Sequence, residues 1–97
     1  MTTYEIHGEA FSTLGGFYDE ISRVLIPDAR WGRNLDAFND ILRGGFGTPA
    51  EGFTLRWTQH QLSSERLGGD FDTLVEIIRV HGSGGDEAED NVRLILD

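Results

Sequence analysis

Four polar side chains between residues 36 and 43 have types and a spacing that could do chemistry. At i, i+3, i+4 and i+7, they are Asp36, Asn39, Asp40 and Arg43. On a helix this spacing places them within an arc of about 100°. Two carboxylates there could act as a general acid and base, or they could bind cationic groups of a partner. Acid–base catalysis requires unequal surroundings for the two carboxyls, which an exposed helix face does not provide. We therefore expect a binding role, and a small hydrolase that uses Asp36 and Asp40 is kept as an alternative.

The segment that carries these residues is predicted to be a short helix from about Asn34 to Arg43. Asparagine is a favoured N-cap residue, and a glycine such as Gly44 is favoured just after the last turn. The apolar side chains fall on the opposite side of the helix and predict its buried face; they are Leu35, Phe38, Ile41 and Leu42. The polar stripe is therefore expected to face outward.

The loops on either side of this helix are unusual because each contains a large aromatic residue. Trp31 lies in the loop before the helix, and Phe46 lies in a glycine-rich stretch after it. Large aromatic residues in loops are costly to expose, so we expect them either to pack against the core or to bind a partner. Two interpretations stay open here: a partner-binding surface with Trp31 and Phe46 as apolar anchors, or a solvated helix face with Trp31 folded into the core.

The remaining hydrophobic pattern predicts an α/β fold with the order β-α-α-β-α-α-β. An apolar stripe from Leu14 to Leu25 indicates a helix, capped by Ser12 or Thr13 and ended by Pro27. Strands joined by helical crossovers pair in parallel, so we expect a three-stranded parallel sheet packed by about four helices. The expected strands are 4–6, 53–57 and 92–96, and the other helices are 34–43, 58–67, and one that Asp70 caps and Gly82 ends.

Length, charge and composition limit the possible functions. The chain has 97 residues, which fits one domain over residues 1–97, and its net charge is −9. This charge argues against direct binding of nucleic acid or of an anionic membrane, and it favours a basic partner. There is no cysteine, no apolar run of membrane-spanning length and no pattern of a signal peptide at the N-terminus. We expect a cytoplasmic protein.

The acidic excess is uneven along the chain. Residues 71–97 carry seven acids and two arginines, whereas residues 32–50 carry two of each. The densest acidic block follows a glycine-rich turn, and we expect the stretch from Gly82 to Asp90 to be a solvated, mobile loop. His7, His60 and His81 lack carboxylate partners at metal-like spacing. No metal or cofactor is therefore expected.

One segment resembles a known family. The run from Trp31 to Gly44 contains an aromatic–glycine pair, then Asn-Leu-Asp-Ala, an apolar residue, one variable position and aspartate. This pattern resembles the barstar family of intracellular ribonuclease inhibitors. The likeness extends through the strand that ends in Trp57 and the closing apolar strand, and thus over nearly the whole chain.

The resemblance implies a mechanism and a partner. Inhibitors of this family insert their second helix and its preceding loop into the active-site cleft of a basic ribonuclease. Asp40 matches the aspartate that occupies the phosphate-binding pocket, and Asp36 matches a second carboxylate that pairs with basic groups. The expected partner is a small basic, barnase-like ribonuclease or another toxin-like nuclease, bound one-to-one by a monomer. Further contact positions implied by the match or its neighbours are Arg30, Trp31, Gly32, Asn34, Ala37, Asn39, Arg43, Gly44, Gly45 and Phe46.

Several positions depart from the pattern of the family's type member. Arg30 stands in place of a tyrosine, Asn39 in place of a tryptophan, and Gly45 in place of another aromatic residue. Val80 stands where the fourth helix carries an acid that helps binding. These differences make the contact segment nearly neutral. They leave open an alternative, in which the chain is an adaptor module of the same fold whose partner is not a ribonuclease.

Overall fold

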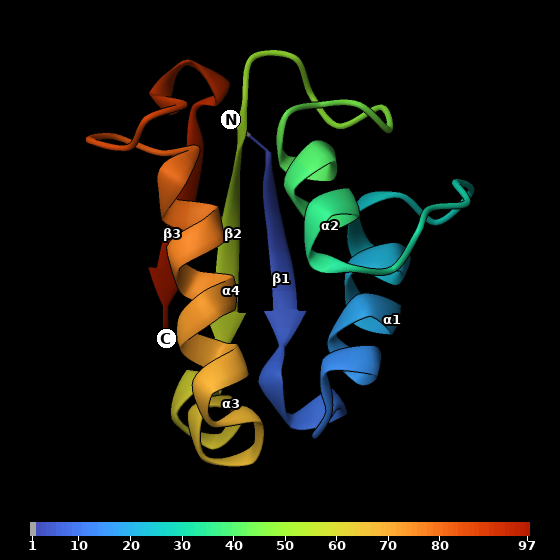
Figure 1. Cartoon of the computed structure of the whole chain (residues 1–97), viewed down its shortest axis with the longest axis vertical. Coiled ribbons are helices and arrows are strands. Elements are labelled where there is room, and N and C mark those ends of the chain that lie inside the picture. The colour runs from blue at the N-terminus through green and yellow to red at the C-terminus, as the bar shows by residue number, and fades with distance from the viewer. Residues whose placement is uncertain (1) are drawn as a thin grey trace.

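The structure is a computed structural model that describes residues 2–97, and it confirms the predicted order of strands and helices (Figure 1). Three strands and four α-helices alternate as β-α-α-β-α-α-β, with two short 3₁₀ helices added. The strands are β1 (Thr3–His7), β2 (Phe53–Thr58) and β3 (Val92–Leu96). The helices are η1 (Gly8–Ala10), α1 (Leu14–Leu25), α2 (Leu35–Leu42), α3 (His60–Leu67), α4 (Gly69–Val80) and η2 (Ala88–Asp90).

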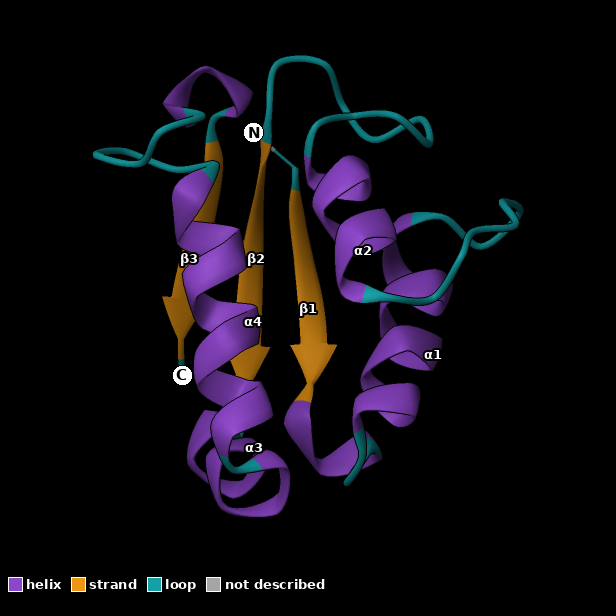
Figure 2. Cartoon of the chain, viewed as in Figure 1, coloured by secondary structure: helices purple, strands orange, loops and turns teal. Residues whose placement is uncertain are grey.

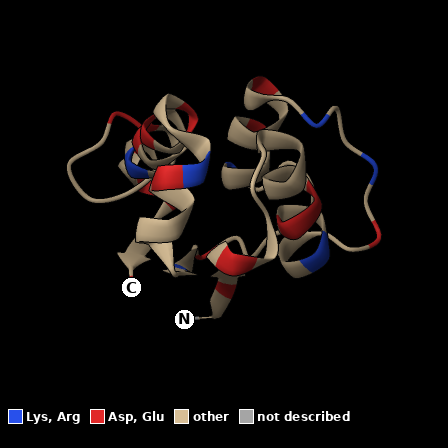
Figure 3. Ribbon diagram, turned by 90° about the horizontal axis from the view of Figure 1, so that it is seen from below, with Lys and Arg blue, Asp and Glu red and all other residues tan. Residues whose placement is uncertain are grey.

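The sheet is parallel, and β2 lies between β1 and β3. Ile6, Trp57 and Leu96 are aligned across the three strands and point to the same face. Because the chain moves across the sheet in one direction, crossovers of one hand place the helices on the same face. Figures 1 and 3 show the helices gathered on that face. The opposite face is more polar, and Glu5, Arg56 and Ile95 are exposed there.

The core between the helices and the sheet is an aromatic cluster around Trp57, whose side chain is fully buried. Phe17 of α1 stacks on Trp57 with ring centroids 5.2 Å apart, and Phe71 of α4 meets it edge-on at 5.1 Å. The indole nitrogen of Trp57 donates a hydrogen bond of 2.9 Å to the hydroxyl of Ser63 on α3. This one side chain therefore joins the sheet to three helices, and its only polar atom is satisfied.

Helix α1 begins and ends for the predicted reasons. The hydroxyl of Thr13 accepts a hydrogen bond from the backbone N–H of Gly16 at 3.1 Å, which identifies Thr13 as the N-cap. The helix ends at Leu25, two residues before Pro27. Its buried Glu20 accepts hydrogen bonds from the backbone N–H of His7 and from Arg23, and so ties α1 to the end of β1.

Two predicted boundaries were wrong. Thr58 continues β2 in place of starting α3, because the sheet pairing extends as far as His7 and Thr58. Asp70 does not cap α4: the helix begins at Gly69 after Gly68, and Asp70 lies in its first turn. There a carboxylate still interacts favourably with the positive end of the helix dipole.

Among the described residues, no helix is long and apolar enough to cross a membrane.

The Glu20 contacts predict that stability depends on pH. Burial favours the neutral carboxyl, but hydrogen bonds from Arg23 and from the His7 backbone lower the pKa of Glu20 overall. Stability from this group is therefore present above the pKa of the unfolded chain and is lost as pH falls through the lower pKa of the folded chain. We expect Glu20→Gln to lower the urea midpoint at neutral pH, and the difference from wild type to shrink towards about pH 3.

The matched control is Glu76→Gln on the exposed side of α4, where the structure gives the carboxylate no ion pair within residues 2–97. A loss of stability in Glu20→Gln that is the same at every pH would contradict the charge-based explanation.

Candidate protein-binding surface on α2

Helix α2 has only eight residues, and side chains or glycine turns satisfy both of its ends. At the start, the carbonyl of the Asn34 side chain accepts a hydrogen bond from the backbone N–H of Ala37 at 2.8 Å. At the end, the Thr48 hydroxyl donates to the carbonyl of Ile41 at 3.2 Å, and the Gly45 N–H donates to the carbonyl of Asp40 at 3.0 Å. Capping matters because isolated helices of this length are unstable in water.

The orientation of α2 is set by its apolar side, as the sequence pattern predicts. Phe38 and Ile41 are fully buried, and the Phe38 ring meets Phe17 of α1 edge-on with centroids 5.3 Å apart. Because Phe38 is held inward, Asp36 and Asp40 lie on the exposed part of the helix. Loops connect α2 on both sides (Figure 2).

The two aspartates differ in their surroundings. Asp36 lies in the first turn of α2 and has no side-chain partner among residues 2–97; the helix dipole favours its charge. Asp40 lies one turn later, where its side chain is 57% exposed and accepts a hydrogen bond of 3.2 Å from Arg43. Both carboxylates can therefore be reached by a partner, and Arg43 orients one of them.

Arg43 links α2 to the loop after α4. Its guanidinium donates two hydrogen bonds to Glu87, of 2.7 and 3.0 Å, in addition to the contact with Asp40. The hydrogen bonds from Arg43 lower the pKa of Glu87, and the same bonds raise the pKa of Arg43. The positive charge of Arg43 is thus shared between two carboxylates.

The loop after α4 reaches Arg43 because it folds back tightly over the end of that helix. The Glu87 N–H donates to the carbonyl of Val80 at 2.9 Å, and the Gly85 N–H donates to the carbonyl of Gly82 at 2.9 Å. A Cβ atom at Gly85 would lie only 2.3 Å from the Val80 carbonyl oxygen. Glycine at position 85 therefore permits the close approach that brings Glu87 to Arg43.

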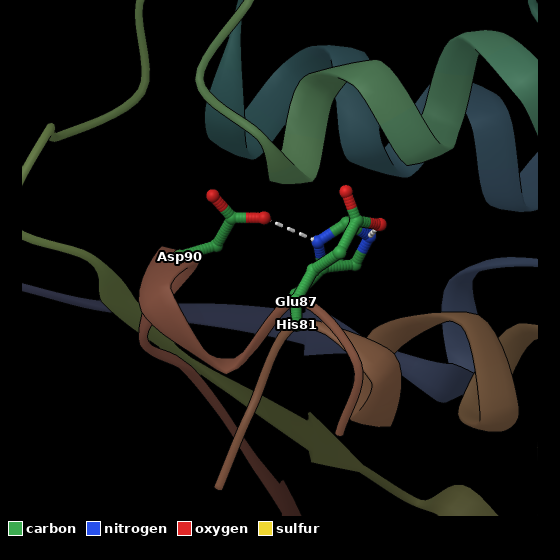
Figure 4. Close-up of side chains that lie close together, drawn as sticks. All are labelled: His81, Glu87 and Asp90. Atoms are coloured by element: carbon green, nitrogen blue, oxygen red, sulfur yellow. Dashed lines mark hydrogen bonds and ion pairs between the residues drawn. The ribbon is translucent and has the colours of Figure 1, made fainter.

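His81, at the end of α4, forms a second link between α2 and this loop. Its side chain is fully buried, and Nδ1 lies 2.6 Å from a carboxylate oxygen of Asp90 (Figure 4). Its Nε2 lies 2.5 Å from the side-chain oxygen of Asn39. Glu87 lies 3.9 Å from Nε2. Asp90 and Glu87 thus lie nearest to different ring nitrogens, and His81, Glu87 and Asp90 each offer one possible ligand atom within 4.8 Å of the other two.

Three parts of the sequence-based expectation need correction at this point. Asn39 does not simply extend the exposed polar stripe, because its side chain turns towards His81 and is half-buried. The stretch from Gly82 to Asp90 is not only a solvated loop, since Glu87 and Asp90 are bound to α2 and to His81. His81 is a satisfied histidine, as expected, but the expectation that it lacks carboxylate partners was wrong, because Asp90 and Glu87 of the following loop lie beside its ring.

The loop before α2 is attached to α1. The Trp31 indole nitrogen donates a hydrogen bond of 2.7 Å to the Ser22 hydroxyl, and its ring meets Tyr18 edge-on at 5.3 Å. Arg33 forms an ion pair with Asp19 of α1. Arg30 is exposed and has no ion pair within the described part of the chain. Figure 3 shows acidic and basic positions mixed along this loop.

The loop after α2 places Phe46 against the preceding loop. Phe46 is half-buried and lines a shallow pocket with Leu25, Ile26, Pro27 and Ala29. Gly44 and Gly47 have φ values of +92° and +97°, which glycine adopts without strain. Phe46 and Trp31 are thus both partly buried by α1 or by the loop that follows it, and each keeps an exposed part.

A comparison with models of protein families shows to which family the chain belongs. The family model described as Barstar (barnase inhibitor) matches residues 1–97, which is the whole chain. This chain belongs to the barstar family. No individual curated protein matches the sequence.

In this barstar-family chain, sequence reasoning predicted the α2 helix and the exposure of its two aspartates, but it missed the groups that contact this segment. The missed groups are Asp19 and Glu87, which pair with arginines, His81, which contacts Asn39, and Asp90, which contacts His81. One signal was present, because residues 30–46 contain three arginines and residues 86–90 contain four acids, and opposite charges attract even when they are distant in the sequence. Which carboxylate pairs with which arginine depends on the path of the loops.

Gly85 gives a direct test of the fold-back. We expect Gly85→Ala to lower the free energy of unfolding by about 1–3 kcal/mol, because its Cβ would collide with the backbone of Val80. Urea denaturation measures the change. The control is Ser83→Ala in the same loop, where the side chain is exposed. Equal losses in the two variants would mean that the loop does not require glycine at position 85.

Proposed function

We propose that this chain inhibits a small basic ribonuclease by occupying the enzyme's phosphate-binding cleft with the exposed carboxylates of α2. Asp40 is the dominant contact and Asp36 the second, while Trp31 and Phe46 flank them as apolar contacts. The chain acts in the cytoplasm as a monomer that forms a one-to-one complex, and it performs no catalytic step itself. A barnase-like enzyme or another toxin-like nuclease fits this partner.

The observation that carries the proposal is the presentation of two carboxylates, one helical turn apart, on a barstar-family chain. Asp36 and Asp40 are both exposed, and buried Phe38 keeps them on the outside. Carboxylates accept paired hydrogen bonds from arginine in the way that phosphate does, so they suit a cleft built to bind RNA phosphates. The capped, well-packed helix holds them in place before binding, which lowers the entropic cost of association.

The charges around α2 also support a basic partner. Residues 30–46 contain three arginines and two aspartates, with a formal charge of +1. Arg33 and Arg43 are paired with Asp19 and Glu87 from outside this segment, and including those two acids changes the local charge to −1. The contact segment is nearly neutral by itself, but together with Asp19 and Glu87 it forms a surface with a net negative charge. Such a surface favours encounter with a cationic cleft.

Replacement of Asp40 tests the phosphate-mimic role. We expect Asp40→Ala to weaken binding to a small basic ribonuclease from the same organism by more than about tenfold, or about 1.4 kcal/mol. The reason is that the arginines of the cleft lose a buried, charged hydrogen-bond partner. Calorimetry or surface binding gives the affinity, and nuclease assays give the inhibition.

The matched control is Glu65→Ala on α3, which removes the same charge from an exposed position away from α2. If Asp40→Ala changes affinity by less than about tenfold, or no more than the control does, Asp40 does not occupy the phosphate site.

Replacement of Arg30 tests whether the partner carries basic or acidic groups opposite this position. Its guanidinium is exposed and has no ion pair among residues 2–97, so it should repel a basic cleft. We expect Arg30→Glu to accelerate association in stopped-flow measurements, and the acceleration to diminish as salt is added. Arg93→Glu on β3 changes the net charge equally and should have a smaller effect. Slower association of Arg30→Glu would instead indicate an acidic group opposite position 30.

A second candidate is an adaptor of the same fold whose partner is not a nuclease. Two observations favour it: Arg30 is free to pair with an acidic group, and Asn39 faces His81 in place of offering an aromatic contact to a partner. Capture of partners from the source organism distinguishes the candidates. Recovery of a small basic nuclease supports inhibition, and recovery of another stable partner without any nuclease supports the adaptor.

A further inference from the structure

His81 is the buried titratable group to which the proposed binding mode gives no role. The residue follows the last residue of α4, and its carbonyl accepts a hydrogen bond of 2.9 Å from the N–H of Val92 at the start of β3. Its imidazole is fully buried between α2 and the loop from 82 to 91 (Figure 4). A polar group in this position must be satisfied by its neighbours, so its contacts are informative.

Each ring nitrogen of His81 faces an oxygen atom. Nδ1 lies 2.6 Å from the Asp90 carboxylate, which accepts hydrogen bonds when it is ionised, so Nδ1 carries a proton. Nε2 lies 2.5 Å from the side-chain oxygen of Asn39, which is also an acceptor, so a hydrogen bond there requires a proton on Nε2. With the Asn39 amide in this orientation, hydrogen bonds at both ring nitrogens require the imidazolium form of His81.

The neutral ring requires the opposite orientation of the Asn39 amide. With the proton gone from Nε2, that nitrogen becomes an acceptor and can bind only the NH₂ group of Asn39. The amide must then turn over, which moves its oxygen from the buried side to the outer side. Because Asn39 is half-buried and adjoins Asp40, the outer side of its amide lies at the surface that α2 offers to a partner.

The charged groups around the ring come from two elements. From the loop after α4, Asp90 contacts Nδ1 and Glu87 lies 3.9 Å from Nε2; from α2, Arg43 binds Glu87 and also contacts Asp40. Asn39 is the polar group of α2 that touches the ring itself. The state of His81 is thus coupled to the same network that orients Asp40.

We propose that His81 is a positioning residue for partner binding, and that its protonation decides whether Asn39 presents a hydrogen-bond donor or an acceptor beside Asp40. With the imidazolium, the Asn39 oxygen is held inward and its NH₂ group faces the partner. With the neutral ring, the oxygen faces the partner. The role in binding rests on the proposed function, whereas the link between His81 and the Asn39 amide does not.

The first experiment tests that link without a partner. Nitrogen NMR of the full chain with isotope-labelled histidine and asparagine follows both groups from about pH 5 to about pH 9. The proposal requires Nε2 of His81 to be protonated whenever the Asn39 oxygen faces it, and unprotonated whenever the Asn39 NH₂ group faces it. The side-chain amide signals of Asn39 should change in step. A ring that keeps one state throughout, or Asn39 signals that stay constant while His81 titrates, would overturn the proposal.

Two substitutions sharpen this measurement. Asn39→Asp places a group at Nε2 that accepts hydrogen bonds when ionised, so we expect the imidazolium to persist to higher pH than in the wild type. Asp90→Asn removes the carboxylate at Nδ1 and should shift the loss of the proton to lower pH. Thermal unfolding checks that each variant is folded. Failure of the folded variants to shift in these opposite directions would contradict the assigned contacts.

The second experiment tests the role in binding. We expect the affinity of the wild type for the nuclease to change with pH by roughly tenfold more than that of Asn39→Ala, because only the wild type exchanges a donor for an acceptor. Titration of the nuclease itself cancels in this comparison. Identical pH profiles would overturn the binding role. If no nuclease binds at any pH, the proposed function fails, while the NMR experiment still decides whether His81 controls the Asn39 amide.

Discussion

The burial of Phe38 is the constraint on which the proposed binding surface depends. An eight-residue helix is not stable alone, and α2 persists because its apolar side is enclosed by the aromatic cluster of Phe17 and Trp57. Once the Phe38 ring is held inward, the helix cannot rotate without exposing it. The positions of Asp36 and Asp40 on the outer side follow directly. The chemistry of the surface is thus determined by an apolar contact that is fully buried inside the chain.

The second structural element is the polar attachment of the loop after α4. Arg43 binds Glu87, and Asn39 contacts His81, which in turn contacts Asp90. These contacts join α2 to a loop more than forty residues away in the sequence. They also bring acidic side chains next to a segment that contains more arginines than aspartates. Buried or partly buried networks of this kind hold geometry well because each unsatisfied member would be costly.

Much of the fold could be predicted because it depends on local patterns. The apolar stripe of α1, the caps at Thr13 and Asn34, and the break before Pro27 are encoded within a few residues. The errors occur where longer-range contacts decide. Thr58 belongs to β2 because β1 pairs with it, and Asp70 is not a cap because α4 begins directly after the turn at Gly68.

The sequence by itself determined which residues can form the surface: an aspartate pair one turn apart, a capped helix to carry it and a family pattern around it. Only the tertiary structure decided the surroundings of those residues. It turned Asn39 towards His81, paired Arg33 with Asp19 of α1, and brought Glu87 to Arg43. The physical reason is that periodicity reports the direction of a side chain on its own helix, whereas charge pairing depends on how close two distant segments come. Here that distance depends on the loop after α4, because glycine at position 85 lets the backbone fold back closely over the end of the helix. The spacing of residues in the sequence does not reveal this fold-back.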